Sequence, residues 1–184
     1  PMAGSAEVMK GITRVPGVRY RALVPNERGA LDALECDTDE IEVVMSISET
    51  HNRKNINMSP DESVRQIIDL TDLAHQQETP VEAILSTAFG CAYEGDIAPE
   101  RVAHYARRIL DEAGVDGLSF GDTSGMATPR VVLFEIDLAM GEAMSIQVLP
   151  NYVTVDLNCD DGYGTGLGNG TSTVYIGGQA NCTV

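Results

Sequence analysis

The sequence predicts an α/β fold in which a parallel sheet is built from alternating strands and helices. Over residues 1–130 of the 184, short apolar runs alternate with longer segments of helical periodicity. This alternation is the pattern of consecutive βα units. Proline or glycine stands near the ends of several segments, where the chain must turn. Beyond residue 130 the pattern is lost, so the prediction applies to the first two thirds of the chain.

Five apolar runs are expected to form strands. The clearest helix between them begins at Ser59, a good N-cap, with Pro60 at the first helical position and Glu62 completing a capping box. The following helix has Pro99 near its start and is capped at its end by Gly114. The predicted strands cover residues 18–24, 40–47, 81–89, 115–120 and 152–158, the other predicted helices residues 2–13 and 27–34, and a polar loop residues 48–58.

The last third of the chain gives weaker signals. Residues 131–149 are apolar without clean periodicity. Seven glycines lie between Asp161 and Val184, and each opposes a helix by about 1 kcal/mol relative to alanine. We therefore expect loop, irregular strand or disorder in this part of the chain.

The charge balance excludes some classes of partner. The net charge is −16, from 28 acidic and 12 basic residues. A nucleic acid or an anionic membrane would need a basic surface, so neither is expected. Such acidity fits adaptation to high salt or, as we prefer, an ordinary acidic cytoplasmic protein.

The four cysteines are too widely spaced to suggest a zinc site. We expect them to be reduced thiols in a cytosol-like compartment. No run of about 18 apolar residues is present, so no transmembrane helix is predicted. These cysteines are Cys36, Cys91, Cys159 and Cys182.

Polar or glycine-rich segments follow each predicted strand. In parallel α/β barrels the active site lies at the carboxyl ends of the strands, so these segments are where functional residues are expected. A purely structural set of loops could look the same. The segments are 25–26, 46–57, 87–95, 119–125 and 158–164.

Three of these segments carry motifs that resemble those of hydroxymethylglutaryl-CoA lyases. Residues 48–59 are similar to the loop after the fourth strand of that family. Residues 89–95 (FGCAYEG) resemble its Gly-Cys-Pro-Tyr-Glu-Gly loop, with Ala92 where proline is usual. Residues 118–129 (LSFGDTSGMATP) are similar to its Ser-Leu-Gly-Asp-Thr-x-Gly-x-x-Thr-Pro turn. The motifs stand in the family's order, and the match covers about residues 1–130.

The resemblance implies a (β/α)₈ barrel of which only about strands three to seven are present, since a full barrel needs about 250 residues. It implies a single partial domain over residues 1–184, with a divergent part from 131 to 184. It also implies a carbon–carbon lyase that cleaves 3-hydroxy-3-methylglutaryl-CoA with Mg²⁺ or Mn²⁺. The partner would be an acyl-CoA thioester, and the chain could form a homodimer. A cytoplasmic location is expected, with the mitochondrial matrix as the other compartment considered.

The resemblance also assigns roles to residues. Ser119 and Asp122 match positions that contact the substrate and are the predicted catalytic residues, although Asp122 could instead cap a turn. Other polar residues at strand ends are expected to line the pocket, and two basic ones to meet the CoA phosphates, unless they belong to a solvated loop. The pocket residues are Asn26, Asn55 and Thr87, and the basic ones Arg53 and Lys54.

The metal site departs from the family pattern. The family has a His-x-His pair on its seventh strand, and Asn158 and Asp160 stand at those positions. Oxygen ligands can still hold Mg²⁺ or Mn²⁺, so both are predicted metal ligands, with a polar turn as the other interpretation.

Three functional hypotheses remain open. The first is the lyase itself. The second is a related acyl-CoA or 2-oxo-acid lyase or synthase, for example one that acts on longer 3-hydroxyglutaryl-CoA chains. The third is a non-catalytic CoA-binding remnant, which the replaced metal histidines favour.

Overall fold

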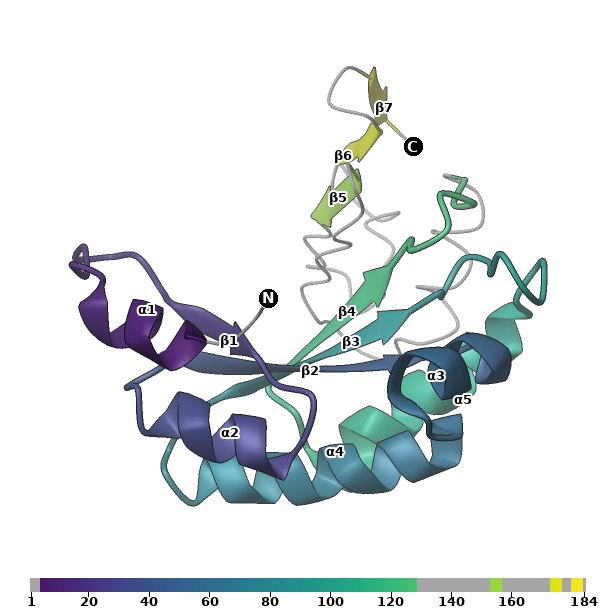
Figure 1. Ribbon diagram of the computed structural model, residues 1–184. Helices are drawn as coiled ribbons and strands as arrows, with labels where there is room; N and C mark the ends of the chain where they lie inside the picture. Colours follow the sequence, from purple (N-terminus) through teal and green to yellow (C-terminus); the bar gives the residue numbers. More distant parts are fainter. Residues whose placement is uncertain (1–3, 129–152, 157–172, 177–179, 184) are drawn as a thin grey trace.

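A parallel four-stranded sheet forms the centre of the protein (Figure 1). The computed structural model describes residues 4–128, 153–156, 173–176 and 180–183. All three strand pairings are parallel, and the spatial order follows the chain order. The strands are β1 (Arg21–Leu23), β2 (Glu40–Ser46), β3 (Val81–Ser86) and β4 (Gly117–Gly121).

Helices connect successive strands and cover one face of the sheet (Figure 1). The connection from β2 to β3 contains two of them, and the one from β3 to β4 continues as a π-helical segment. A further helix precedes β1. In chain order the helices are α1 (Ser5–Gly11), α2 (Glu27–Leu34), α3 (Glu49–Ile56), α4 (Pro60–His75), α5 (Pro99–Arg108) and η1 (Ile109–Ala113).

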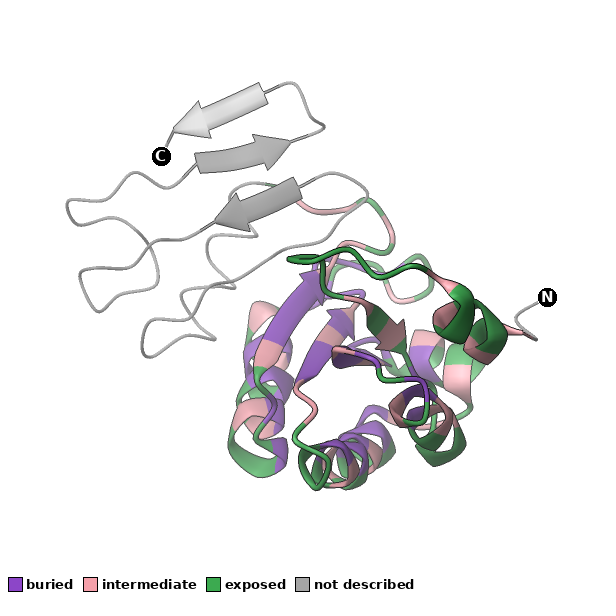
Figure 2. Cartoon of the chain, turned by 90° about the vertical axis from the view of Figure 1, so that its left-hand side faces the viewer, coloured by how far each residue is buried: buried purple, intermediate pink, exposed green. Residues whose placement is uncertain are grey.

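The hydrophobic core lies between the sheet and the helices α2, α4 and α5 with η1 (Figure 2). Alternate residues of the central strands point into it, because successive side chains of a strand face opposite ways. β2 contributes Ile41 and Met45, and β3 contributes Leu85. They pack with the apolar face of α4, which includes Val64 and Ile67, and all five are at most 2% exposed.

The opposite face of the sheet carries the alternate residues and is called here the open face. It includes Glu42, Val44 and Ser46 of β2, which pair in register with residues of the same face on β3. Glu42 and Val44 are partly exposed, in contrast to the residues beside them. In a closed parallel barrel this face would be the barrel interior.

Several local predictions are confirmed. Ser59 accepts a hydrogen bond from the Glu62 N–H at 3.2 Å, and the Glu62 carboxylate accepts one from the Ser59 N–H at 2.7 Å. This is the predicted capping box, with Pro60 as the first residue of α4. Gly114 ends the following helix in the left-handed conformation, at φ 64°.

The prediction of a polar loop over residues 48–58 is wrong, because this segment contains α3. Ser48 is its N-cap, and the hydroxyl accepts a hydrogen bond from the His51 N–H at 3.1 Å. Asn57 closes the helix in the left-handed conformation. Local capping and charges placed favourably for the helix dipole stabilise a helix that has almost no apolar face.

The predicted strand at 152–158 forms over residues 153–156, but not as part of the parallel sheet. β5 (Val153–Asp156), β6 (Thr173–Ile176) and β7 (Ala180–Thr183) make a separate antiparallel sheet. The expectation that the parallel array runs through a fifth strand is therefore wrong for the described residues. β6 and β7 are close in the sequence, as antiparallel neighbours can be, and Val174, Tyr175 and Ile176 are residues that favour strands.

Candidate active site

The residues that follow β2, β3 and β4 meet at one edge of the sheet, called here the carboxyl edge. Thr123 is the point where two of them join. Its hydroxyl lies 2.6 Å from the Ser86 hydroxyl and accepts a hydrogen bond from the Thr87 N–H at 3.0 Å. Gly90 approaches the same turn so closely that an added Cβ would lie 2.7 Å from Met126. The second and third sequence motifs are thus in direct contact.

Thr87 connects this edge to β2. Its hydroxyl accepts a hydrogen bond from the Ser48 N–H at 3.1 Å and donates one to the Ser86 carbonyl at 2.6 Å. Thr87 has a φ of 56°, which is rare for a β-branched residue and is found mostly where the surrounding structure enforces it. The side chain is fully buried. Its contact with a substrate remains a prediction.

Asp122 organises the turn after β4. Its carboxylate accepts hydrogen bonds from the Met126 N–H at 2.9 Å and the Ala127 N–H at 3.2 Å. The turn-capping role considered for this residue is therefore present. A carboxylate has about four acceptor positions, and Asp122 is only partly buried, so it can also contact a ligand.

Ser119 lies on the open face of β4 and is almost completely buried. Its hydroxyl donates a hydrogen bond to Glu82 on β3. Gly117 provides the space for this contact, because a Cβ there would lie 3.3 Å from the Glu82 Cγ. The sequence interpretation missed Glu82. The available signal was an acidic residue at an alternate position of an otherwise apolar strand.

Glu82 belongs to an ion-pair network on the open face. Arg21 pairs with Glu82, with Glu40 at 3.0 Å and with Glu42 at 3.5 Å. Arg19 adds a second pair with Glu40 at 3.1 Å. Burial raises the pKa of the Glu40 carboxyl above its usual range, against the opposing charges of Arg21 and Arg19. The negative charges of three carboxylates are therefore compensated by two guanidinium groups.

The loop after β3 is fastened to α3. Glu94 accepts a hydrogen bond from the Thr50 N–H at 2.7 Å and pairs with Arg101 at 3.1 Å. The Cys91 thiol, buried and unpaired with another cysteine, lies 3.0 Å from the Ser48 hydroxyl. Burial raises the Glu94 pKa, but the hydrogen bonds from Thr50 and Ser48 and the charge of Arg101 outweigh it, so the net shift is downward.

Replacing Glu94 by Gln is expected to destabilise the protein by about 1 kcal/mol at pH 7, because the contacts of a charged acceptor become neutral ones. The folded-state pKa of Glu94 is lowered, so its stabilisation is present above the unfolded pKa and is lost as the pH falls through the folded pKa. Urea unfolding at pH 7 and pH 3 checks this. A difference between wild type and Glu94→Gln that is unchanged at pH 3 would contradict the assignment.

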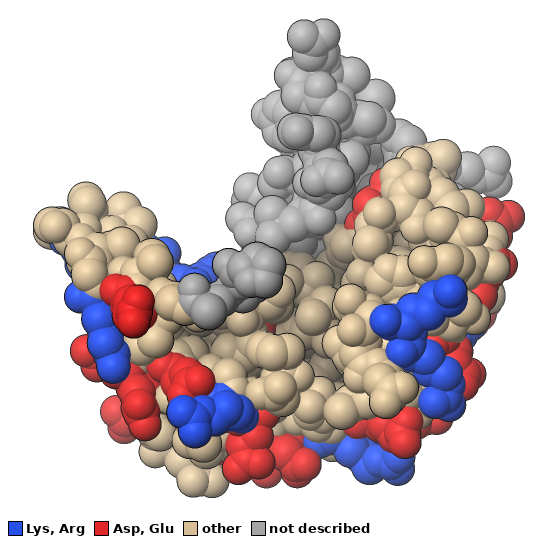
Figure 3. Space-filling model, viewed as in Figure 1, with Lys and Arg blue, Asp and Glu red and all other residues tan. Residues whose placement is uncertain are grey.

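The remaining predicted substrate-binding residues lie at the surface near this edge. Asn26 accepts a hydrogen bond from the Gly29 N–H at 3.0 Å and caps α2. Asn55 is exposed on α3 rather than at a strand end. Arg53 pairs with Glu49 at 3.0 Å, and the Lys54 ammonium lies 4.6 Å from the centre of the Tyr93 ring. The basic side chains over α3 are visible in Figure 3.

The predicted metal ligands, Asn158 and Asp160, lie outside the described residues. Within the described part of the chain, no group of three His, Cys, Asp or Glu side chains is arranged to hold a metal ion. The same part of the chain contains no helix long and apolar enough to cross a membrane.

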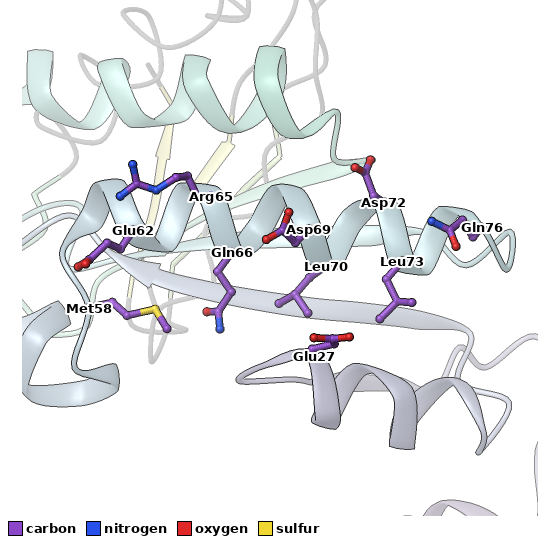
Figure 4. A pocket seen from close by; sticks show the side chains of 10 residues that line it. All are labelled: Glu27, Met58, Glu62, Arg65, Gln66, Asp69, Leu70, Asp72, Leu73 and Gln76. Carbon is purple, nitrogen blue, oxygen red and sulfur yellow. The ribbon is translucent and has the colours of Figure 1, made fainter.

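A groove on the helical side of the protein is separate from the carboxyl edge. It runs between α2 and α4, with Leu70 and Leu73 at its floor (Figure 4). Glu27, Asp69 and Asp72 are among the acidic side chains that line it. None of the predicted site residues lines this groove, and its acidic wall opposes an anionic thioester. We therefore place the candidate site at the carboxyl edge.

A comparison with known protein families gives a match over the whole chain. The model of the HMGL-like family matches residues 1–184. The chain belongs to the HMGL-like family. The hydroxymethylglutaryl-CoA lyase of Bacillus subtilis is 39% identical over 171 residues, which cover 93% of this chain and 54% of that protein. The cytoplasmic 3-hydroxy-3-methylglutaryl-CoA lyase of the mouse is 36% identical over 96% of this chain and 49% of that protein.

Solved structures of HMGL-like relatives confirm the fold class. The crystal structure of the Brucella melitensis HMG-CoA lyase superposes with a TM-score of 0.75 at 34% identity, covering 79% of this chain and 52% of that one. An Acinetobacter baumannii HMG-CoA lyase, solved with coenzyme A and 3-methylmalate, gives a TM-score of 0.69 at 32% identity over 73% and 44% of the two chains. The chain spans about half the length of the relatives it matches. It therefore contains part of an α/β barrel of this family.

Proposed function

We propose that the protein to which this chain belongs cleaves 3-hydroxy-3-methylglutaryl-CoA into acetyl-CoA and acetoacetate. The observation that carries the proposal is the meeting of three family motifs at the carboxyl edge. The motif of residues 89–95 contacts the first motif through Cys91 and Ser48, and the third through Ala92 and Ser124. Membership in the HMGL-like family and the names of the relatives support it. The carboxyl ends of strands are also where parallel barrels bind their substrates.

Cleavage of the thioester substrate requires specific chemical groups at the carboxyl edge. Removing the proton of the tertiary hydroxyl allows the bond between C2 and C3 to break, so that C3 becomes the ketone of acetoacetate. The electron pair passes to C2 as the enolate of acetyl-CoA, which then takes up a proton. Hydrogen-bond donors or positive charge must stabilise first the alkoxide and then the enolate.

We assign the central contacts to Ser119 and Asp122. Ser119 is held by Glu82, and Asp122 by the amides of its own turn, so both are fixed before a substrate arrives, as efficient catalysis requires. Asn26, Asn55 and Thr87 are proposed to contact the acyl and pantetheine parts, and Arg53 and Lys54 the CoA phosphates.

A divalent cation, Mg²⁺ or Mn²⁺, is part of the proposal. Asn158 and Asp160 would hold it, and their oxygen donors are of the kind that these hard cations prefer. When bound, such an ion lowers the energy of an alkoxide. The described residues supply no complete set of ligands, so further ligands would have to come from elsewhere in the protein.

The substrate could also be a longer acyl chain. A Pseudomonas aeruginosa relative, named for lyase activity on 3-hydroxy-3-isohexenylglutaryl-CoA as well as hydroxymethylglutaryl-CoA, is 41% identical over 69% of this chain and 42% of that protein. This is the observation that favours a second candidate within the same reaction class.

We also propose a cytoplasmic location, as in the names of the mouse and human relatives, and a homodimeric assembly.

A panel of 3-hydroxy-3-alkylglutaryl-CoA thioesters with methyl, butyl and isohexenyl branches tests the assignment. The full-length protein, supplied with Mn²⁺ or Mg²⁺, is expected to release acetyl-CoA fastest from the methyl compound. A higher kcat/KM for the isohexenyl compound would favour the second candidate. Thioester binding without any turnover, and without dependence on metal, would favour a non-catalytic CoA-binding protein instead.

A further inference from the structure

His51 is held at the carboxyl edge by a contact that none of the roles above uses. Its Nδ1 lies 2.7 Å from the hydroxyl of Ser46, the last residue of β2. This is hydrogen-bonding distance for either direction of the proton. His51 is only partly buried, whereas Ser46 is almost completely buried. The imidazole is therefore fixed at one nitrogen by a rigid strand.

Two features place this imidazole beside the open face rather than in the core. Ser46 pairs in register with Ser86 and shares its face of the sheet, and Ser86 in turn contacts Thr123 at 2.6 Å. The neighbouring residue Asn52 takes the buried position of α3, where it accepts a hydrogen bond from the Ser46 N–H at 2.8 Å. His51 thus extends a row of hydroxyl groups along the carboxyl edge.

Among the residues that the structure describes, the second ring nitrogen of His51, Nε2, forms no hydrogen bond with the protein. The Tyr93 ring lies 6.1 Å away, centre to centre, and carries the Lys54 ammonium on its face. Because Nδ1 is hydrogen-bonded to Ser46, Nε2 is the ring atom that can contact a ligand. The hydrogen bond at Nδ1 then sets the orientation of the ring.

We propose that His51 is a further substrate-binding residue, which hydrogen-bonds through Nε2 to an oxygen of the bound acyl thioester, and that Ser46 is its positioning residue. The inference rests on the proposed function, because it takes the acyl-CoA to bind at this edge. It gives a role to His51, which lies within the first motif but to which the resemblance assigned none. In a chain of net charge −16, an imidazole beside Lys54 is a suitable partner for an anionic ligand.

Steady-state kinetics of the full-length protein tests the contact. His51→Phe keeps a flat ring but removes Nε2, and we expect kcat/KM to fall about tenfold, the worth of one good hydrogen bond. Ser46→Ala leaves the imidazole in place without its support, and we expect a smaller loss, carried mainly by KM. His104→Phe, the same change at an exposed position of α5, is the matched control and should change kcat/KM by less than twofold.

Nitrogen-15 NMR of the histidine rings separates binding from mere structure. Adding the substrate or acetyl-CoA to the wild type should move the His51 Nε2 signal and leave that of His104 in place. Ser46→Ala should change the Nδ1 signal of free His51, because the tautomer is no longer held. If the His51 signal moves but no turnover is measured, the proposed contact of His51 is supported and only the proposed lyase activity is contradicted. A His51→Phe variant with wild-type kcat/KM, or a His51 signal unmoved by both ligands, would overturn the proposal.

Discussion

Replacing Asp122 by Asn is expected to lower kcat/KM for the thioester about 100-fold, because the substrate would lose the charged acceptor proposed to orient it, and a small misplacement of a bound substrate costs about that much. Asn keeps the shape of the side chain, and its one acceptor oxygen keeps one of the two hydrogen bonds that the Met126 and Ala127 amides donate to separate oxygens of Asp122. It removes the negative charge and puts a donor where an acceptor stood. The free energy of unfolding should fall by only about 1–2 kcal/mol.

A second change in the same turn serves as the control. Ser124 accepts a hydrogen bond from the Ala92 N–H at 3.2 Å, so Ser124→Ala disturbs the turn without touching a predicted catalytic group. We expect its kcat/KM to stay within about threefold of the wild type. If Asp122→Asn and Ser124→Ala lower activity by similar factors, Asp122 acts only as a turn cap and its catalytic assignment is wrong.

Replacing Arg21 by Met should produce the largest loss of stability, about 3 kcal/mol in urea unfolding at pH 7. Glu40 and Glu82 are buried partners of Arg21 and would lose its compensating charge. Breaking a buried ion pair by removing one member costs about 3–5 kcal/mol. We expect the lower end, because the Arg21 side chain itself is 32% exposed.

The pH dependence of this loss has a definite sign. The Glu40 pKa is already raised by burial, and removing Arg21 would raise it further. A carboxyl group whose pKa is higher in the folded than in the unfolded protein stabilises the fold at pH values below the unfolded pKa. This stabilisation is lost as the pH rises through the folded pKa. The destabilisation by Arg21→Met should therefore shrink as the pH falls from 7 toward 4.

Arg28 provides the control for this experiment. It pairs with Asp32 at 3.0 Å on the exposed face of α2, and its side chain is 84% exposed. Arg28→Met should leave the midpoint of urea unfolding almost unchanged, because an exposed ion pair contributes little to stability. Adding Glu82→Gln to Arg21→Met should recover part of the loss, since one unpaired carboxylate is removed. Equal losses for Arg21→Met and Arg28→Met would show that the network is not coupled to folding.

Much of the fold could be predicted because its signals are local. The parallel strands β1 to β3 lie within the predicted runs, β4 overlaps its run and ends one residue later, and the start of α4 follows from the Ser59–Glu62 capping box. α3 could not be predicted from periodicity, because it is stabilised by its caps and buries a polar residue, Asn52, against Ser46 and Ser63. Only three-dimensional contacts reveal that a polar segment is ordered.

The candidate site was predictable to a smaller extent. The order of the motifs predicted that the loops containing Thr87 and Asp122 lie at one edge of the sheet. In the structure these loops contact each other through Thr123. The partners on the open face were missed, because Glu82 and Ser119 are 37 residues apart in the chain and adjacent only through strand register. His51 was expected to lie in a loop, so its contact with Ser46 could not be foreseen.

The most direct test of the account is the stoichiometry of the reaction catalysed by the full-length protein. Incubation of 3-hydroxy-3-methylglutaryl-CoA with the protein and Mn²⁺ is expected to yield one acetyl-CoA and one acetoacetate for each thioester consumed, as measured by chromatography and an acetoacetate assay. Free CoA formed without acetoacetate would indicate thioester hydrolysis. That result, or an unchanged thioester, would contradict the assignment of carbon–carbon lyase activity to this fold.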